Sequence, residues 1–333
     1  MDRAANASVD LVIPIYNEER VLPTLLQRLD EVFAPDVLET HGISRVRYRF
    51  VDDGSRDASA ELLANHDRHP ERVVLYRLSR NFGHASAVSA GLDHADADVV
   101  AVLDADLQDP PELVLDMLAR WREGIDVVFA QRRKRKENIL KRVGYWTFYR
   151  LVSLLSDLDI PLDSGDFCLM DRRVVDAMRS LPERLRFPRI LRTWVGFRQA
   201  GIEYDRPERA AGTTKYGFWR LYQLATDGIA SSSIRLLRVA QLFSFSFAIL
   251  TAILLAILIL SLGTYADRPE SLLILGGLIL IAGGNFVITT CLYILGAYVG
   301  RTYLEAKGRP PYLVMEVVGE DPVGENARDV NRT

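Results

Sequence analysis

A short acidic segment, DADLQD at Asp104–Asp109, holds the side chains with the clearest chemical potential. If the chain stays extended there, alternation puts Asp104, Asp106 and Gln108 on one side. Carboxylate and amide oxygens suit a hard cation such as Mg²⁺ or Mn²⁺, which shares its coordination shell with phosphate oxygens. The segment therefore predicts a metal site that would neutralise a departing diphosphate. A pair of aspartates is a weak signal alone, and a solvated acidic turn before Pro110 is the alternative.

Other polar clusters also follow apolar runs that resemble strands. Asp52 and Asp53 open the cluster DDGS, where a carboxylate could accept hydrogen bonds from a nucleobase or a ribose. An ordinary turn is the alternative, since Gly54 suits a turn with positive φ. Tyr16–Glu18 closes another apolar run. Arg80 follows a third, where it would either neutralise a donor phosphate or hold its own loop.

The elements that must position these clusters alternate between strand and helix. Apolar runs predict strands at Val9–Ile13, Val46–Val51, Val73–Leu78, Val99–Leu103 and Ile125–Ala130. Helical patterns predict helices at Glu18–Phe33, Ala58–Asn65 and Ala85–His94, and another after Pro110-Pro111. This alternation is typical of a parallel sheet with covered faces, which binds ligands beyond the carboxyl ends of its strands. No glycine-rich dinucleotide motif or P-loop follows any strand, which argues against those two folds.

A basic run follows the last predicted strand. Arg132 to Lys136 are five consecutive cations at the ligand edge of the predicted sheet. They fit the capture of a lipid phosphate, which Arg132 and Arg133 could bind with paired hydrogen bonds. A basic loop lying on a lipid surface is the alternative. Lys215, in a loop flanked by glycines, is a further candidate phosphate contact.

The composition separates a charged N-terminal part from an apolar C-terminal part. Hydrophobic residues make up 49% of the 333 residues and charged residues 26%, yet Val239–Ala266 and Ser271–Gly300 carry no charge. Each stretch exceeds the roughly 20 apolar residues that cross a bilayer as a helix. Arg235 and Arg238 before the first stretch, and Arg301 after the second, predict that both ends lie in the cytoplasm. Buried core helices are the alternative.

Several function classes are excluded or disfavoured by charge and cysteine content. A net charge of −3 gives no reason to expect nucleic-acid binding. Cys168 and Cys291 are too far apart to suggest a disulfide framework or a cysteine metal site.

The glycine pairs Gly276-Gly277 and Gly283-Gly284 permit close helix contact, either within a hairpin or in an oligomer.

These patterns define the expected domain organisation. We expect a cytoplasmic catalytic domain at 1–215, amphipathic juxtamembrane helices at 216–238, two transmembrane helices at 239–300 and a cytoplasmic tail at 301–333. Tyr145–Leu155 and Trp219–Ile229 mix aromatic and apolar residues, which predicts helices at the membrane interface or, alternatively, ordinary core packing.

Six motifs occur in an order that resembles one enzyme family. They are IPIYNEE (Ile13–Glu19), VDDGS (Val51–Ser55), LSRNFGH (Leu78–His84), DADLQDPPE (Asp104–Glu112), SGDFCLMDR (Ser164–Arg172) and GTTKY (Gly212–Tyr216). The sequence resembles the polyisoprenyl-phosphate glycosyltransferases of glycosyltransferase family 2, the group of dolichol-phosphate mannose synthase. With two predicted spans, it is most similar to the bacterial glucosyl and aminoarabinosyl transferases.

The resemblance implies a GT-A fold, a Rossmann-like α/β domain with a mostly parallel sheet, followed here by a C-terminal transmembrane hairpin. It implies that the nucleoside is held by Pro14, Tyr16, Glu18 and Asp53, and the metal and diphosphate by Asp104, Asp106 and Gln108. Cys168 departs from the family, which usually has arginine there. If that arginine touches phosphate, another cation must substitute in this chain.

Asp166 is the candidate catalytic base, but the chemistry asks little of it. A phosphate monoester has a second pKa of about 6, so it is largely ionised at neutral pH. Asp166 would then act either as a base or as a group that positions the acceptor or an arginine. Both roles are open from the sequence.

The expected function is a metal-dependent, inverting transfer of a hexose from a nucleotide sugar to a polyisoprenyl phosphate at a bacterial plasma membrane. UDP-glucose is the favoured donor, with GDP-mannose or a UDP-aminosugar as alternatives, and a homo-oligomer in contact with membrane lipids is expected. A processive polysaccharide synthase is disfavoured because two spans are too few for a channel and Arg192-Thr193-Trp194 lacks the glutamine of Q-x-x-R-W. A non-catalytic membrane scaffold is disfavoured by the intact acidic segment.

Overall fold

The computed structural model describes residue 3 and residues 6–66, 71–132, 164–184, 186–205, 244–254, 256–257, 259 and 269–319. The chain divides into two compact units. The first comprises Met1–Gly144, Ile160–Tyr216 and Arg309–Thr333, and the second comprises Tyr145–Asp159 and Gly217–Gly308.

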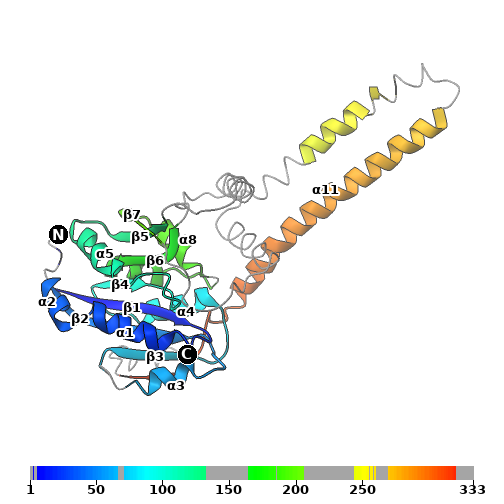
Figure 1. Cartoon of the computed structure of the whole chain (residues 1–333). Helices are drawn as coiled ribbons and strands as arrows, with labels where there is room; N and C mark the ends of the chain where they lie inside the picture. Colours follow the sequence, from blue (N-terminus) through cyan, green and yellow to red (C-terminus); the bar gives the residue numbers. More distant parts are fainter. Residues whose placement is uncertain are drawn as a thin grey trace. The chain divides into compact units, whose positions relative to one another are not determined.

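An eight-stranded mixed sheet, in the order β7-β5-β6-β4-β1-β2-β3-β8, forms the centre of the first unit (Figure 1). The strands are β1 (Ala7–Ile15), β2 (Ile43–Asp52), β3 (Val73–Leu78), β4 (Val99–Val102), β5 (Val127–Arg132), β6 (Ser164–Asp171), β7 (Gln199–Tyr204) and β8 (Val314–Val318). Strands β4, β1, β2 and β3 run parallel to one another, and β5 runs parallel to β7. Strands β6 and β8 run antiparallel to the strands they contact. The parallel block therefore delivers the ends of β1 to β4 to one edge.

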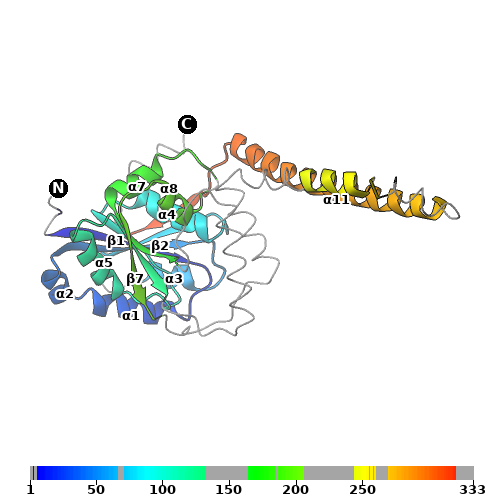
Figure 2. The ribbon, with the colours of Figure 1, turned by 90° about the horizontal axis from the view of Figure 1, so that it is seen from above.

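Helices cover both faces of this sheet (Figure 2). They are α1 (Leu22–Val32), α2 (Pro35–Thr40), α3 (Ser59–Ala64), α4 (His84–His94), α5 (Leu113–Arg122), α7 (Arg172–Arg179) and α8 (Pro188–Trp194). Alternation along β1 separates two cores: Leu11 packs with the α1 and α5 side, whereas Val12 packs with α4, α7 and α8. Gly91 allows helix α4 to lie close to β1, since a Cβ on this residue would come 2.3 Å from Val12 Cγ1.

The strands and helices predicted up to residue 130 are confirmed, with shifts of a few residues at their ends. Strand β5 is displaced most, since it begins at Val127 and continues to Arg132, so the basic run starts inside the strand. Three strands were not predicted. Strand β6 inserts between β4 and β5, and β7 and β8 form the two edges.

The residues expected as a C-terminal tail contain β8, which pairs with β3. Val318 is opposite Leu75 in the register. The backbone N–H of Ser79 donates to the carbonyl of Leu313 at 2.9 Å, and Arg77 pairs with Glu316 at 2.7 Å. Val314–Val318, which lies within the predicted tail, is thus an edge strand of the sheet.

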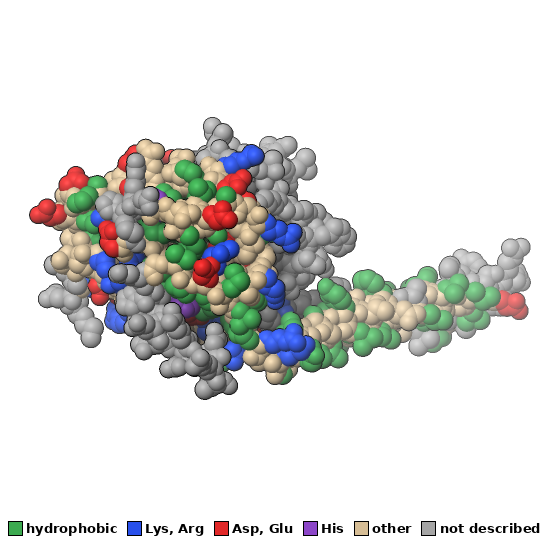
Figure 3. Space-filling model, turned by 90° about the horizontal axis from the view of Figure 1, so that it is seen from below, with side chains coloured by type: hydrophobic (Ala, Val, Ile, Leu, Met, Phe, Trp, Pro, Cys, Tyr) green, Lys and Arg blue, Asp and Glu red, His purple; other side chains and the backbone are tan. Residues whose placement is uncertain are grey.

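In the second unit, α11 (Pro269–Ala306) is a long apolar helix. Its segment Gly276–Ala306 has a mean hydropathy of 2.1, and by length and composition it can cross a membrane. Figure 3 shows apolar side chains along much of the helix, with charged side chains near its ends. Among the described residues it is the one helix that meets both conditions. The other predicted span lies partly outside the described residues, so the two-helix hairpin stays a prediction.

A shorter apolar helix, Ser244–Leu254, packs against α11. A Cβ on Gly283 would lie 2.3 Å from Cε2 of Phe247, and Ser244 Oγ is 3.8 Å from Cys291 Sγ. Of the two uses open to the pair Gly283-Gly284, the structure shows contact within the chain. The predicted interfacial helices at Tyr145–Leu155 and Trp219–Ile229 lie outside the described residues.

Candidate active site

The loops after β1 and β2 are fastened to each other by side chains of the DDGS turn and of α3. The N–H of Asn17 donates to Ser55 Oγ at 2.9 Å, and the N–H of Glu18 donates to Ser59 Oγ at 2.8 Å. Pro14 lies within β1, opposite Val51. These bonds bring the predicted nucleoside contacts Pro14, Tyr16 and Glu18 to the end of β2.

The turn after β2 is also held against the loop after β3. Gly54 has a φ of +70°, and a Cβ there would lie 2.6 Å from the carbonyl carbon of Arg80. Glycine is therefore required both by conformation and by close approach. The Asp53 carboxylate accepts hydrogen bonds from the N–H groups of Phe82 at 2.6 Å and Gly83 at 2.9 Å. Burial raises the pKa of Asp53, although these two hydrogen bonds lower it.

Arg80 is an exposed member of this loop. Its guanidinium carbon lies 3.9 Å from the ring centroid of Phe82, and Nη1 donates to the carbonyl of Asn81 at 2.9 Å. Of the two roles considered for Arg80, these contacts support that of holding its loop. Contact with a donor phosphate stays a prediction.

The acidic segment after β4 is a turn rather than an extended strand. Leu107 has a φ of +60°, and the N–H of Gln108 donates to Asp106 Oδ1 at 3.1 Å. Asp109 is buried, where it accepts from the N–H of Asp104 at 3.2 Å and from the hydroxyl of Tyr204 at 3.1 Å. The premise that an extended chain aligns Asp104, Asp106 and Gln108 is therefore wrong. Asp109 thus joins the two ends of the turn and ties them to Tyr204 on β7.

The oxygen ligands in this turn suit a cation whose remaining coordination positions are filled by water and by substrate phosphates. Within the described ranges, no three or more His, Cys, Asp or Glu side chains form a ready-made metal cluster. Asp104 and Asp106 are partly exposed at the end of β4. Mg²⁺ usually binds one or two carboxylates together with waters and substrate phosphates. The two carboxylates, with Gln108, are therefore suited to an ion that is completed by a diphosphate.

Two carboxylates alternate with two nitrogen-bearing side chains beside this turn. His84 Nε2 lies 3.8 Å from Asp104 Oδ1 and 3.3 Å from Asp166 Oδ2. Arg189 Nε lies 3.4 Å from the other Asp166 oxygen. We call Asp104, His84, Asp166 and Arg189 the charged row. They come from the end of β4, the start of α4, β6 and α8, and between 29% and 42% of each side chain is exposed, so a ligand can reach them.

The members of the charged row shift one another's ionisation. Burial alone would lower the pKa of His84, but the hydrogen bond to Asp166 and the charges of Asp104 and Asp166 raise it to about 9. Burial alone would raise the pKa of Asp166, but His84, Arg189 and Arg192 hold it below its usual range. Asp166 is thus an ionised carboxylate with a partner at each oxygen.

Neither His84 nor Arg189 was among the sequence candidates. His84 ends the LSRNFGH motif, so a signal was present, because that motif lies at the ligand edge. Arg189 belongs to none of the six motifs, and nothing in the sequence places it beside Asp166.

Arg192, also on α8, lies behind the charged row next to Cys168. Both side chains are buried, and the Arg192 guanidinium carbon is 5.6 Å from the ring centroid of Phe129. Burial raises the pKa of the Cys168 thiol, and the charge of Arg192 opposes this effect. The chain therefore lacks an arginine at position 168 on β6 but has cations from α8 in the same neighbourhood.

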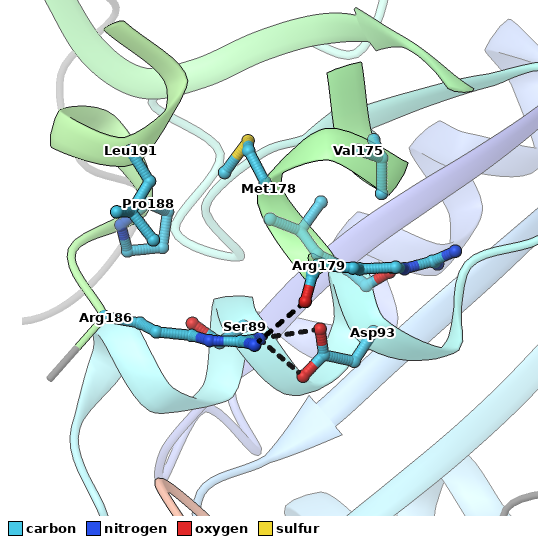
Figure 4. A pocket seen from close by; sticks show the side chains of 9 residues that line it. Ser89, Asp93, Val175, Met178, Arg179, Arg186, Pro188 and Leu191 are labelled. Atoms are coloured by element: carbon cyan, nitrogen blue, oxygen red, sulfur yellow. Dashed lines mark hydrogen bonds and ion pairs between the residues drawn. The ribbon is translucent and has the colours of Figure 1, made fainter. Parts of the chain in front are cut away.

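A partly buried ion pair fixes the segment just before α8. Arg186 Nη1 donates to both oxygens of Asp93 on α4, at 2.8 and 2.9 Å (Figure 4). Asp93 also accepts from the hydroxyl of Tyr312 at 2.9 Å, so the segment before β8 meets the same carboxylate. The small pocket above the pair is lined mainly by apolar side chains such as Met178 and Leu191. No residue of the charged row lines this pocket.

Three sequence candidates have side chains outside the described residues. Only the backbone of Arg132 is described, at the end of β5, whereas Arg133 and Lys215 are not described. Their predicted contacts with phosphate stay predictions.

The family description that matches this sequence is "Glycosyl transferase family 2", over residues 10–179. The chain belongs to this family. The matched range contains the acidic turn and Asp166, whereas α8 with Arg189 lies beyond it. A family 2 glycosyltransferase transfers a sugar.

Relatives of this glycosyltransferase match it over nearly the whole length. An uncharacterised glycosyltransferase of Bacillus subtilis (strain 168) is 42% identical, covering 93% of this chain and 94% of its own. A bactoprenol glucosyl transferase derived from the SfII prophage of Shigella flexneri is 37% identical, covering 92% and 97%. An undecaprenyl-phosphate 4-deoxy-4-formamido-L-arabinose transferase of Shewanella sediminis (strain HAW-EB3) is 34% identical, covering 97% of both chains.

Proposed function

We propose that this family 2 glycosyltransferase moves a hexose from a nucleotide sugar to a polyisoprenyl phosphate. The observation that carries the proposal is near full-length similarity to relatives named for such acceptors, bactoprenol and undecaprenyl phosphate. The charged row beside the acidic turn supports it, because it brings cationic and anionic groups together where an anionic donor and an anionic acceptor would meet.

The reaction is a single displacement with inversion at the anomeric carbon. An oxygen of the lipid phosphate attacks this carbon in line, and the bond to the diphosphate breaks, so the nucleoside diphosphate takes the electron pair. Asp104 and Asp106, with Gln108, would hold a Mg²⁺ or Mn²⁺ ion, whose charge offsets the negative charge on the leaving group.

On the donor side, the fastened loops after β1, β2 and β3 form the nucleoside site. Pro14, Tyr16 and Glu18 lie at the end of β1, and Asp53 shapes the facing loop through Phe82 and Gly83. Arg80 and Lys215 are proposed contacts of the donor phosphates.

On the acceptor side, Asp166 needs no proton from a phosphate that is already ionised. Its partners His84 and Arg189 support a positioning role. Arg132 and Arg133 are proposed to draw the lipid phosphate toward this edge.

The apolar helix α11 supports a membrane location, which a lipid acceptor requires. We propose that two spans anchor the enzyme with its catalytic unit in the cytoplasm of a bacterial cell, where it meets a soluble donor. We also propose that the enzyme forms a homo-oligomer.

UDP-glucose is the proposed donor, since the Shigella relative is named a glucosyl transferase. A UDP-aminosugar is the second candidate, because the Shewanella relative is named for a formamido-arabinose. The glucosyl relative is slightly more similar, at 37% against 34% identity.

The test is to incubate the purified full chain with a short-chain polyprenyl phosphate, Mg²⁺ and, separately, UDP-glucose, GDP-mannose and a UDP-aminosugar. The lipid product is identified by mass. We expect a hexosyl lipid with UDP-glucose, none with Asp104→Ala, and wild-type yield with Asp116→Ala, which removes an exposed carboxylate from α5. Absence of lipid product with every donor would overturn the proposal.

A further inference from the structure

The charged row runs, contact by contact, from Asp104 through His84 and Asp166 to Arg189. Arg189 is therefore its last member. We propose that Arg189 binds the phosphate of the acceptor, and that Asp166 positions Arg189 instead of taking a proton from the acceptor. This inference rests on the proposed function and names the residues that recognise its anionic substrate.

The first support is the state of the Asp166 carboxylate. His84 lies 3.3 Å from one oxygen, and Arg189 lies 3.4 Å from the other. A hydroxyl acceptor would need a base with an available oxygen within hydrogen-bond reach. A carboxylate held between two partners is poorly placed for that task. An acceptor that arrives ionised, such as a phosphate monoester, makes no such demand.

The second support is the geometry of Arg189. A guanidinium is always charged and offers five donors in a planar fork that matches phosphate. Within the described part of the chain, Asp166 is the one ion-pair partner of Arg189, and it is reached through Nε. The side chain is 42% exposed, although Nε itself is buried and makes no hydrogen bond to the described residues. The ion pair with Asp166 therefore holds the Nε end of the guanidinium, and the exposed part of the side chain is where a phosphate would bind.

The third support is Arg192, which lies three residues further along α8. It is buried, and its Nε and Nη2 have no hydrogen-bond partner among the described residues. A buried guanidinium near Cys168 adds positive potential behind Asp166, which favours the ionised carboxylate. The helix α8 therefore contributes two cations to one side of the row, one accessible and one buried.

The order of the row matches an in-line displacement. Asp104 belongs to the turn that would hold the leaving diphosphate, and His84 stands between it and Asp166. Arg189 is on the other side of Asp166. Because attacking and leaving oxygens must be on opposite sides of the anomeric carbon, the two anionic substrates need separate cationic contacts. Arg189 provides a cationic contact that is separated from Asp104 by His84 and Asp166 in the row.

Steady-state kinetics with two variable substrates tests this assignment. The acceptor probe is a short-chain polyprenyl phosphate, and the donor is the nucleotide sugar that wild type uses. For Arg189→Gln we expect the KM for the lipid phosphate to rise on the order of 10- to 100-fold, the range of a charge-assisted hydrogen bond. The KM for the nucleotide sugar should stay within about twofold, because the donor contacts lie elsewhere. Arg189→Lys should recover part of the loss, and Arg120→Gln, an exposed change on α5, should match wild type.

The same assay separates the two roles of Asp166. Asp166→Asn should raise the KM for the lipid phosphate, as Arg189→Gln does. A catalytic base would instead reveal itself by a fall in kcat of about 10²- to 10⁴-fold at saturating acceptor. Melting temperatures of all variants, compared with wild type, exclude unfolding as the cause.

Three outcomes would overturn the inference. They are an unchanged lipid KM in Arg189→Gln, a rise confined to the nucleotide-sugar KM, and transfer by wild type to a short-chain polyprenol that lacks phosphate. Failure of the proposed function looks different, because wild type itself would then make no lipid product, and the inference would fall with it.

Discussion

The carboxylate of Asp53 accepts a hydrogen bond from the backbone N–H of Gly83, with an N···O distance of 2.9 Å. Gly83 is the residue that precedes α4, and His84 is the first residue of that helix. The turn after β2 is therefore linked by a hydrogen bond to the residue that precedes His84, a member of the charged row. A residue assigned to the nucleoside by resemblance has a second task in the fold, which is to set the position of His84.

Replacement of Asp53 should disturb both stability and activity. In Asp53→Ala, the N–H groups of Phe82 and Gly83 lose their acceptor, and each unsatisfied group costs about 1–3 kcal/mol. We expect a lower melting temperature by tryptophan fluorescence and a lower rate of transfer. Asp116→Ala is the control, since it removes an exposed carboxylate. An unchanged melting temperature would show that the loop is held by other contacts.

Gly54→Ala should be more damaging than an ordinary substitution at a positive φ. The strained conformation costs about 1–3 kcal/mol, and the new Cβ also meets the backbone of Arg80. The matched control is Gly196→Ala, because Gly196 has a φ of +78° and a Cβ added to it would meet nothing within 4 Å. The difference in free energy of unfolding between the two variants measures the close approach alone. Equal destabilisation would contradict the tight contact between the loops.

Removal of divalent cations should abolish transfer. We expect EDTA-treated enzyme to lose at least about 100-fold in rate, because a metal contributes several kcal/mol to stabilising the leaving group. Added Mg²⁺ or Mn²⁺ should restore the rate. Asp106→Asn is the better variant for this test, because Asp104 also contacts His84 and its loss would have a second effect. The transfer rate of Asp106→Asn should stay low at the metal concentration that saturates wild type. Full activity in EDTA would remove the metal from the mechanism.

Asp96 should make the stability of the fold depend on acid pH. Its Oδ1 lies 2.6 Å from Arg49, 3.2 Å from Arg47 and 3.3 Å from Arg45. Burial alone would raise the pKa of Asp96, but the three arginines lower it. The stability that this carboxylate contributes is therefore present above the unfolded value of about 3.9 and is lost as pH falls through the lower folded pKa.

A comparison of wild type with Asp96→Asn measures this contribution. The gap between their melting temperatures should be widest near pH 6 and should close as pH falls below about 4. Asp116→Asn serves as the control for an exposed aspartate. A gap that stays constant across this range would mean that the arginines do not stabilise the charge.

The sequence was informative where chemistry and strand ends coincide. Val99–Val102 and the acidic segment after it were predictable because a β-branched run ends directly in carboxylates. The turn itself was not, since it depends on Asp109 meeting the hydroxyl of Tyr204, far away in the chain. Strand β6 does not show the alternation of apolar and polar residues that predicts a strand, because its successive residues Phe167 and Cys168 are both apolar and are buried in two different cores.

Arg189 could not be predicted from the sequence for a physical reason. Its role depends on where α8 is held, and this depends on the pair between Arg186 and Asp93 on another helix. Arginines are common on short surface helices, and only the packing distinguishes this one. His84 was within reach of prediction, because its motif follows a strand at the same edge as the acidic segment.

The pairing of β8 with β3 imposes a parity rule on the polypeptide. One strand precedes α11 and the other follows it, yet both belong to a single sheet, which must lie wholly in one compartment. If the chain crosses a bilayer between Leu78 and Val314, it must therefore cross it an even number of times, so that both strands end on the same side. If α11 is one passage, its counterpart falls between Tyr204, the last residue of β7, and Pro269, where α11 begins.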